Sequence, residues 1–134
     1  MPFPFRRRRD DGRAPAEPRS PFSPDVTPDK KAELLLWSKL TVAQRRTYWS
    51  GYFDVTGSLG GEYRIHLSST VQNITETRSS FSRCEVSYCV TVLGVPRCDV
   101  WLFQKILIES DERRFLREAV RYPWSYVVYD EAFR

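Results

Sequence analysis

The pattern of apolar and polar positions divides the chain after residue 26 into helical segments, then strands, then helices again. The segment Thr27-Pro28-Asp29 combines a capping side chain with a Pro suited to a first helical turn, and strong helix formers follow over residues 32–40. Thr41 and Gln44 have the spacing of a capping box. The pattern therefore predicts one helix that begins at the first signal and a second from about Val42 to Trp49.

After the second helix the apolar residues recur at every second position, which is the period of a β-strand. Residues 52–56 and 62–67 are expected to pair as an antiparallel hairpin around the Gly-rich turn at 57–61. Residues 71–75 are a further candidate strand. The run from Cys84 to Leu93 has the strongest strand pattern, with β-branched and aromatic residues alternating with polar ones. These segments predict a small antiparallel sheet of three to four strands with one buried face.

Two further helices are expected after the break at Gly94-Val95-Pro96. Asp99 is predicted to cap a largely apolar helix that contains residues 100–108 and packs on the sheet. Ser110-Asp111-Glu112 begins the next helix, and the acidic cluster that these residues form with Glu109 suits the positive end of a helix dipole. A Pro stops this helix, and its expected apolar stripe consists of Phe115, Leu116, Ala119 and Val120. The predicted fold class is α+β, with N-terminal and C-terminal helices packed on the sheet.

Proline is concentrated in the first 28 residues, which hold seven of the nine Pro: Pro2, Pro4, Pro15, Pro18, Pro21, Pro24 and Pro28. Because proline locks φ and lacks an N–H donor, this segment is predicted to be an extended arm rather than a packed element. The expected organisation is an arm over residues 1–28, an α+β domain over 29–122 and a C-terminal tail over 123–134.

Phe and Arg side chains are the candidate contacts of the arm: Phe3, Phe5, Arg6, Arg7, Arg8, Arg9 and Phe22. One interpretation is a solvated tail, since charge runs are common in such segments. The other is an arm that orders on a partner, with Phe in small apolar pockets and Arg paired with acids or phosphates. A Pro-rich segment loses less entropy on docking than a Gly-rich one, which favours the second interpretation.

The C-terminal tail is rich in aromatic residues, with Trp124, Tyr126, Tyr129 and Phe133 as its candidate interface. A segment of this apolarity is not expected to remain free in water. We therefore expect the tail to pack on the α+β domain or on a neighbouring subunit.

Composition limits the chemistry, because the chain of 134 residues has three Cys, one His and a net charge of +4. Cys84, Cys89 and Cys98 form no CxxC pair and His66 is distant from them, so no metal site and no cofactor are expected. His66 is interpreted as a strand residue at the surface or in a polar contact. The segment at 57–61 lacks the GK[ST] ending of a phosphate loop and is predicted to be a hairpin turn. The protein is predicted not to be an enzyme.

Nucleic-acid binding is the alternative that the basic residues raise. Arg side chains with nearby Tyr and Trp could line one side for phosphate contact and base stacking: Arg45, Arg46, Arg64, Arg78, Arg83 and Arg97, with Tyr52, Tyr63 or Trp49. The arm, however, has six Arg against four acids, and the remaining chain also carries a net charge of only +2. This weak electrostatic footprint does not favour nucleic acid as the partner.

A series of short motifs in the folded part also carries a resemblance to a known family. The order of these motifs resembles that of a small bacterial and phage α+β domain family. The motifs are Leu40-Thr41-x-x-Gln44-Arg45, Tyr52-Phe53-x-Val55-x-Gly57, Tyr63-Arg64-Ile65, Asn73-Ile74, Val95-Pro96-x-x-Asp99, Phe103-Gln104-Lys105 and Asp111-Glu112-x-x-Phe115-Leu116. The resemblance covers roughly residues 36–120. It implies one compact domain and supplies no activity and no catalytic residues.

Together these observations predict a non-enzymatic structural or accessory subunit of a larger protein assembly. A phage-like virion or similar particle is the setting that the resemblance implies, and other protein subunits are the expected partners, contacted through the arm and the tail. The alternative is a small nucleic-acid-binding or regulatory protein. With no run of 18 apolar residues and no secretory signal, we expect no membrane span and a location in the cytoplasm or within a particle. No small-molecule substrate is expected.

Overall fold

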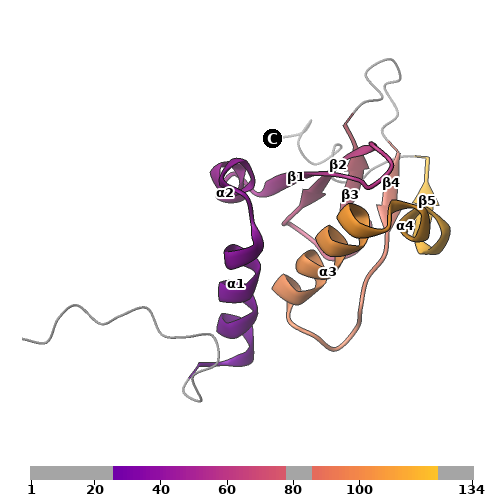
Figure 1. The fold of residues 1–134 in the computed structure, drawn as a ribbon. Coiled ribbons are helices and arrows are strands. Elements are labelled where there is room, and N and C mark those ends of the chain that lie inside the picture. The colour runs from indigo at the N-terminus through magenta and orange to yellow at the C-terminus, as the bar shows by residue number, and fades with distance from the viewer. Residues whose placement is uncertain (1–25, 78–85, 124–134) are drawn as a thin grey trace, which may run out of the picture.

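The computed structural model describes residues 26–77 and 86–123 (Figure 1). Several predicted features lie outside these described residues. They are the arm contacts Phe3, Phe5, Arg6, Arg7, Arg8, Arg9 and Phe22, the tail contacts Trp124, Tyr126, Tyr129 and Phe133, and Cys84.

Both predicted N-terminal helices are confirmed, with their caps. Helix α1 spans Pro28–Lys39, and the Thr27 side chain accepts a hydrogen bond from the Lys30 backbone N–H (3.2 Å). Helix α2 spans Val42–Tyr48 and carries the complete capping box. The Gln44 side chain accepts from the Thr41 N–H at 2.9 Å, and the Thr41 hydroxyl accepts from the Gln44 N–H at 3.2 Å. Local side-chain chemistry therefore sets where both helices begin.

Within the described residues the sheet has five strands, where three to four were expected. They are β1 (Tyr52–Thr56), β2 (Glu62–His66), β3 (Ile74–Glu76), β4 (Ser87–Cys89) and β5 (Val120–Tyr122). They pair in chain order as an antiparallel meander. The hairpin predicted around residues 57–61 is confirmed, with Phe53 opposite Ile65 and Val55 opposite Tyr63.

Strands β3 and β4 are shorter than predicted. Strand β3 begins at Ile74 rather than at residue 71, because Gln72 has a positive φ of 52°, which interrupts an extended chain. Strand β4 has three residues rather than ten. Beyond Cys89 the carbonyl of Val90 accepts from the Gln104 side chain (2.9 Å) and does not join a strand ladder. Ser87 and Tyr88 are both buried, so β4 does not have one buried face and one exposed face.

The two C-terminal helices form, with corrections at their ends. Helix α3 spans Arg97–Ser110 and its N-cap is Pro96 with no side-chain cap, so Asp99 lies in the first turn and does not cap the helix. Helix α4 spans Glu112–Glu118 and Asp111 caps it by accepting from the Arg114 N–H (3.1 Å).

The expected apolar stripe of α4 is confirmed for Phe115 and for Ala119, which packs partly buried against the core, and is wrong for its other two members. Phe115 is fully buried, whereas Leu116 and Val120 are exposed. The chain leaves the helix at Ala119, which has an extended conformation, and Val120 begins the edge strand β5 opposite Cys89. Pairing with β4 therefore ends the helix before the proline that was predicted to stop it.

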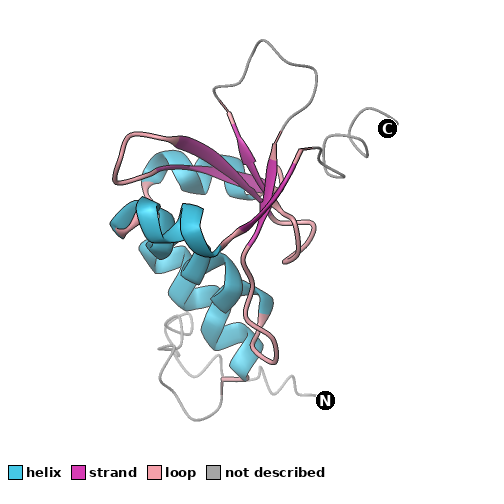
Figure 2. Ribbon diagram, turned by 90° about the vertical axis from the view of Figure 1, so that its right-hand side faces the viewer, coloured by secondary structure: helices cyan, strands magenta, loops and turns pink. Residues whose placement is uncertain are grey.

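The helices gather on one face of the sheet, and α1 packs along α3 (Figure 2). The core between them is formed by fully buried side chains from both layers: Leu36, Phe53, Ile65, Ile74, Ile108 and Phe115. No helix of the described residues is long and apolar enough to cross a membrane. The α+β fold class is thus confirmed. This arrangement leaves the outer side of α1, the exposed side of α2 and the start of α3 available to form a surface.

Candidate interaction surface

A cleft of about 750 Å³ opens between the first turns of α1 and the start of α3. Its lining comes from the helix starts, from the last residue of α2 and from the residue after β2: Thr27, Asp29, Lys30, Glu33, Tyr48, Leu67, Val95, Pro96, Arg97, Cys98 and Trp101. This volume lies within the range of about 300–1,000 Å³ that is usual for ligand pockets.

One wall of the cleft is aromatic and held in place. The Trp101 indole donates to the Ser69 carbonyl at 2.9 Å, which fixes the ring against the turn after β2. Arg97 lies over the same ring, with its guanidinium carbon 5.9 Å from the ring centroid. Pro96, the N-cap residue of α3, adds a further apolar surface beside them. The wall is therefore rigid before any ligand binds.

The charges that line the cleft are balanced. Asp29 and Glu33 contribute two carboxylates, and Lys30 and Arg97 contribute two cations. Lys30 and Glu33 form an exposed ion pair at 3.3 Å. Exposed ion pairs of this kind are weak. Either side chain can therefore leave its partner and pair with a ligand group of opposite charge at a small cost in free energy.

Tyr48 and Cys98 are the titratable groups of the cleft whose pKa values are clearly altered. Burial, with the Cys98 thiol beside the phenol, raises the pKa of Tyr48 to about 12. Burial likewise raises the pKa of Cys98, against the effect of the hydrogen bond from Tyr48. Both groups are therefore neutral near pH 7, and a protonated thiol is a poor nucleophile and a poor metal ligand. This chemistry suits recognition better than covalent catalysis.

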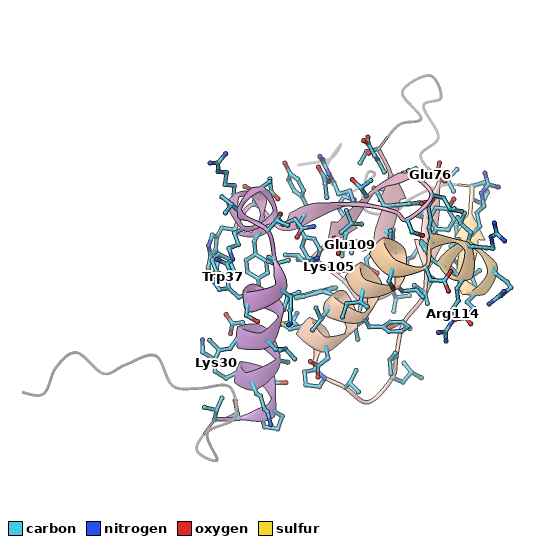
Figure 3. All side chains as sticks on the ribbon, viewed as in Figure 1. Lys30, Trp37, Glu76, Lys105, Glu109 and Arg114 are labelled. Carbon is cyan, nitrogen blue, oxygen red and sulfur yellow. The ribbon has the colours of Figure 1, made fainter. Side chains whose placement is uncertain are left out.

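An aromatic cluster formed by Trp37, Tyr48 and Trp49 adjoins the cleft. Tyr48 meets Trp37 and Trp49 edge to face, with ring centroids 5.4 and 5.1 Å apart, and the two Trp centroids are 5.8 Å apart. Arg45 lies over Trp37 at 5.2 Å and donates to its carbonyl at 3.1 Å. Figure 3 shows Trp37 on the side of α1 that faces away from the sheet.

Trp49 is the most exposed ring of the cluster, with 76% of its surface accessible. Its two ring neighbours nevertheless restrict its position. Tyr48 belongs to both the aromatic cluster and the cleft, so the two features form one continuous surface. Trp, Tyr and Arg are the residue types that dominate binding energy at protein interfaces.

From the sequence, Trp49 was considered only as a stacking residue for nucleic acid, and this surface was not identified. The detectable signal was the pair of Trp residues that flank the capping-box turn, at positions 37 and 49. Their contact depends on the angle between α1 and α2, which the capping box alone does not specify.

The basic residues considered for nucleic acid are distributed over separate places. Arg45 is at the aromatic cluster and Arg97 is at the cleft. Arg64 covers the Tyr52 ring at 3.9 Å and pairs with Asp54 at 2.8 Å. Tyr63 is buried and cannot stack on a base. Arg78 and Arg83 lie outside the described residues.

The acidic cluster of the sequence separates into three structural roles, of which only that of Asp111 is a helix cap. Glu109 pairs with the buried Lys105 at 2.6 Å (Figure 3) and also accepts from the Gln44 side chain at 3.2 Å. Glu112 lies inside the hairpin turn between β1 and β2. The helix-dipole interpretation was therefore wrong for Glu109 and incomplete for Glu112.

Glu112 holds the hairpin turn through both carboxylate oxygens. Oε1 accepts from the backbone N–H groups of Leu59 (2.9 Å) and Gly61 (3.1 Å), and Oε2 accepts from the Tyr63 hydroxyl (2.7 Å). Burial and this hydrogen bond raise the pKa of Tyr63. The contact joins α4 to the hairpin and is structural, since the carboxylate is almost fully buried.

His66 is buried in a polar contact, not at the surface. Its Nε2 lies 3.0 Å from the Thr75 hydroxyl. Burial, together with the positive charge of Arg64, lowers the pKa of His66 to about 4. No cluster of three or more His, Cys, Asp or Glu suited to a metal ion occurs within residues 26–77 and 86–123.

Comparison of the chain with known protein families, with curated protein sequences and with solved structures finds no significant match. The resemblance to a small bacterial and phage domain family therefore stays a prediction.

Proposed function

We propose that this protein is a non-enzymatic structural or accessory subunit of a larger protein assembly, with a phage-like virion or similar particle as its setting. It binds a partner subunit through the surface formed by the aromatic cluster and the cleft. The arm and the aromatic tail provide further contacts to neighbouring subunits. Exposure of Trp49 within a fixed group of rings is the observation that supports this proposal most directly.

Binding at this surface carries a small entropic cost. A large exposed aromatic side chain that is already restricted loses little conformational entropy when a partner covers it. Trp49 is held by Tyr48 and Trp37, and Arg45 in turn is held against Trp37. The apolar area of these rings then contributes to affinity with only a small ordering penalty.

The side chains that line the cleft also support a role in binding a protein rather than in catalysing a reaction. The cleft presents neutral Tyr48 and Cys98 side chains, one aromatic wall and balanced charges, which together recognise a polypeptide better than a single charged metabolite. Val95 at the rim is exposed, which adds apolar surface of the kind that subunit interfaces cover.

The proposal is tested by sedimentation of the epitope-tagged full chain from its native host. We expect the chain to sediment with a large protein assembly, and we expect Trp49→Ala to move it to light fractions. Leu59→Ala is the matched control, because Leu59 is an exposed apolar residue of the hairpin turn that belongs to neither the cleft nor the aromatic cluster. Sedimentation of the tagged chain only as free protein would contradict the proposal. Salt-sensitive binding to DNA or RNA would favour the alternative of a nucleic-acid-binding protein.

A further inference from the structure

Positive charge is concentrated at the end of the molecule that α4 and β5 form. The four arginines of residues 112–122 are all exposed: Arg113, Arg114, Arg117 and Arg121. The same residues include two glutamates, of which Glu112 is buried in the hairpin turn. The exposed charges are therefore four arginines against Glu118, a net of +3, whereas the charges that line the cleft are balanced.

Two of these arginines have no acidic partner among the described residues. Arg114 pairs with Glu118 at 3.0 Å, and Arg121 lies beside the Tyr88 hydroxyl. For the side chains of Arg113 and Arg117, residues 26–77 and 86–123 provide neither an ion pair nor a hydrogen bond. Both guanidinium groups are therefore available to a ligand.

The placement of Arg113 is not explained by the stability of α4. Arg113 is the second residue of the helix, where a cation meets the positive end of the helix dipole. Arg117 is in the last turn, which suits a cation, but it lies four positions from Arg113, and like charges at that spacing repel. A ligand that brings negative charge to this side of α4 relieves both effects.

An exposed apolar side chain adjoins the two arginines. Leu116 is 44% exposed and lies three positions after Arg113 on the same helix. Residues three and four positions apart are neighbours on a helix surface, so Arg113 adjoins both Leu116 and Arg117. We call these three residues the α4 patch.

The composition of the α4 patch favours a polypeptide ligand over nucleic acid. Single-stranded nucleic acid is bound by stacking of its bases on aromatic rings, and the aromatic residue of α4, Phe115, is fully buried. Guanidinium groups bind carboxylates through two parallel hydrogen bonds. Leu116 adds affinity when the ligand covers it with apolar surface, which a polypeptide side chain supplies.

The spacing of the two arginines sets the spacing of the carboxylates. Four residues of an α-helix rise about 6 Å along its axis. In an extended peptide, side chains at alternate positions point to the same side and are about 6.6–6.8 Å apart. Two acidic residues separated by one residue therefore reach Arg113 and Arg117 together.

We propose that the α4 patch binds an extended acidic segment of a partner protein. Two carboxylates of that segment, separated by one residue, pair with Arg113 and Arg117, and an apolar side chain covers Leu116. This inference goes beyond the proposed function, because it assigns a second surface with a ligand of its own. Figure 3 shows Arg114 of α4 and Trp37 of the aromatic cluster at opposite ends of the molecule, so both surfaces can be occupied at once.

The proposal is tested with the full chain and a fluorescein-labelled peptide, Gly-Leu-Ser-Glu-Ser-Glu-Ser-Gly, by fluorescence anisotropy at low salt. A matched peptide has Gln in place of both Glu. We expect the acidic peptide to bind and the Gln peptide to bind about tenfold more weakly, because its amides do not form charge-assisted pairs. Affinity for the acidic peptide should fall as salt is added, since the pairs are exposed. Equal binding of the two peptides, or no binding of the acidic one, would overturn the proposal.

Protein variants locate the binding site. We expect Arg113→Gln/Arg117→Gln to weaken binding of the acidic peptide about tenfold and Leu116→Ser to weaken it about threefold. The double variant should unfold at or slightly above the temperature of the unaltered chain, because it removes the repulsion on α4. The matched control is Lys39→Gln/Arg46→Gln, which removes two exposed positive charges near the aromatic cluster and should leave the affinity unchanged.

Two further outcomes would contradict the proposal. Equal loss of affinity in the two double variants would show that the peptide responds to net charge and not to the α4 patch. Tighter binding of a labelled DNA duplex than of the peptide, lost in Arg113→Gln/Arg117→Gln, would assign the patch to nucleic acid. Trp49→Ala should bind the acidic peptide normally, so this experiment and the sedimentation experiment fail independently of each other.

Discussion

Asn73 and Gln104 exchange two amide hydrogen bonds of 2.9 Å each in the interior of the protein. Asn73 also donates to the carbonyl of His66 at 3.2 Å, and Gln104 to that of Val90 at 2.9 Å. Both side chains are fully buried. The pair thus connects α3 to the sheet through a polar contact whose donors and acceptors are all satisfied.

Removal of one member should leave the other amide buried with one N–H donor and its carbonyl acceptor unpaired. We expect Gln104→Leu to lower the free energy of unfolding by about 2–3 kcal/mol, measured by urea denaturation. Ile106→Ala is the control on the exposed side of the same helix and should have a small effect. In a double-mutant cycle with Asn73→Leu, the two effects should be strongly non-additive; additive losses would show that the pair does not act as a unit.

Glu112 should be essential to the hairpin turn through its charge and its shape. In Glu112→Gln an NH₂ group replaces an oxygen that accepts from backbone N–H groups or from the Tyr63 hydroxyl, so two donors face each other in a buried place. We expect a loss of about 2–4 kcal/mol in unfolding free energy. Glu118→Gln, on the exposed side of α4, is the matched control. Equal stability of both variants would refute this role.

Gly57 should be required because of Glu112 and not because of its backbone. Its φ lies outside the left-handed region, yet a Cβ at this position would overlap the Glu112 carboxylate. We expect Gly57→Ala to cost about 2 kcal/mol in an otherwise unaltered chain. In the Glu112→Ala background the same change should cost much less, as measured by thermal unfolding. A cost that is the same in both backgrounds would point to the backbone instead.

The stability of the protein should fall below pH 6.5 because of His66. Its pKa is about 4 in the folded state against about 6.5 in the unfolded chain, so between these values the unfolded state binds more protons. The free energy of unfolding therefore decreases as the pH falls through this window, by about 3 kcal/mol in total. His66→Gln should reduce the difference in stability between pH 7 and pH 4. An identical pH profile for the variant would contradict the assignment.

Much of the fold could be predicted from local sequence patterns. The start of α1, the capping box of α2 and the hairpin between β1 and β2 were predicted at their correct positions, because each depends on residues within a few positions of one another. The length of β4 and the existence of β5 were not, because strand pairing needs a partner that is distant in sequence. A β-branched run such as 84–93 indicates suitability for a sheet but not where the partner ends.

The candidate surface was harder to predict from the sequence than the fold. Trp37 and Trp49 are twelve positions apart and meet only because of the angle at which α2 follows α1 (Figure 1). From the sequence, Glu112 was interpreted as an acidic residue that suits the start of its own helix. Its hydrogen-bond partners Leu59, Gly61 and Tyr63 instead belong to a hairpin about fifty residues earlier. Neither relationship has a local signal, since it arises from how separate elements pack.

The sequence by itself determined where helices begin, where the first hairpin turns and which segment contains the prolines, because capping, turn chemistry and the loss of an N–H donor act within a few residues. The tertiary structure decided which strands end early, which carboxylate enters the turn and which rings form the exposed cluster. Those outcomes depend on hydrogen-bond partners and packing between distant segments, as with Val90, whose carbonyl is taken by Gln104 of α3 rather than by a neighbouring strand.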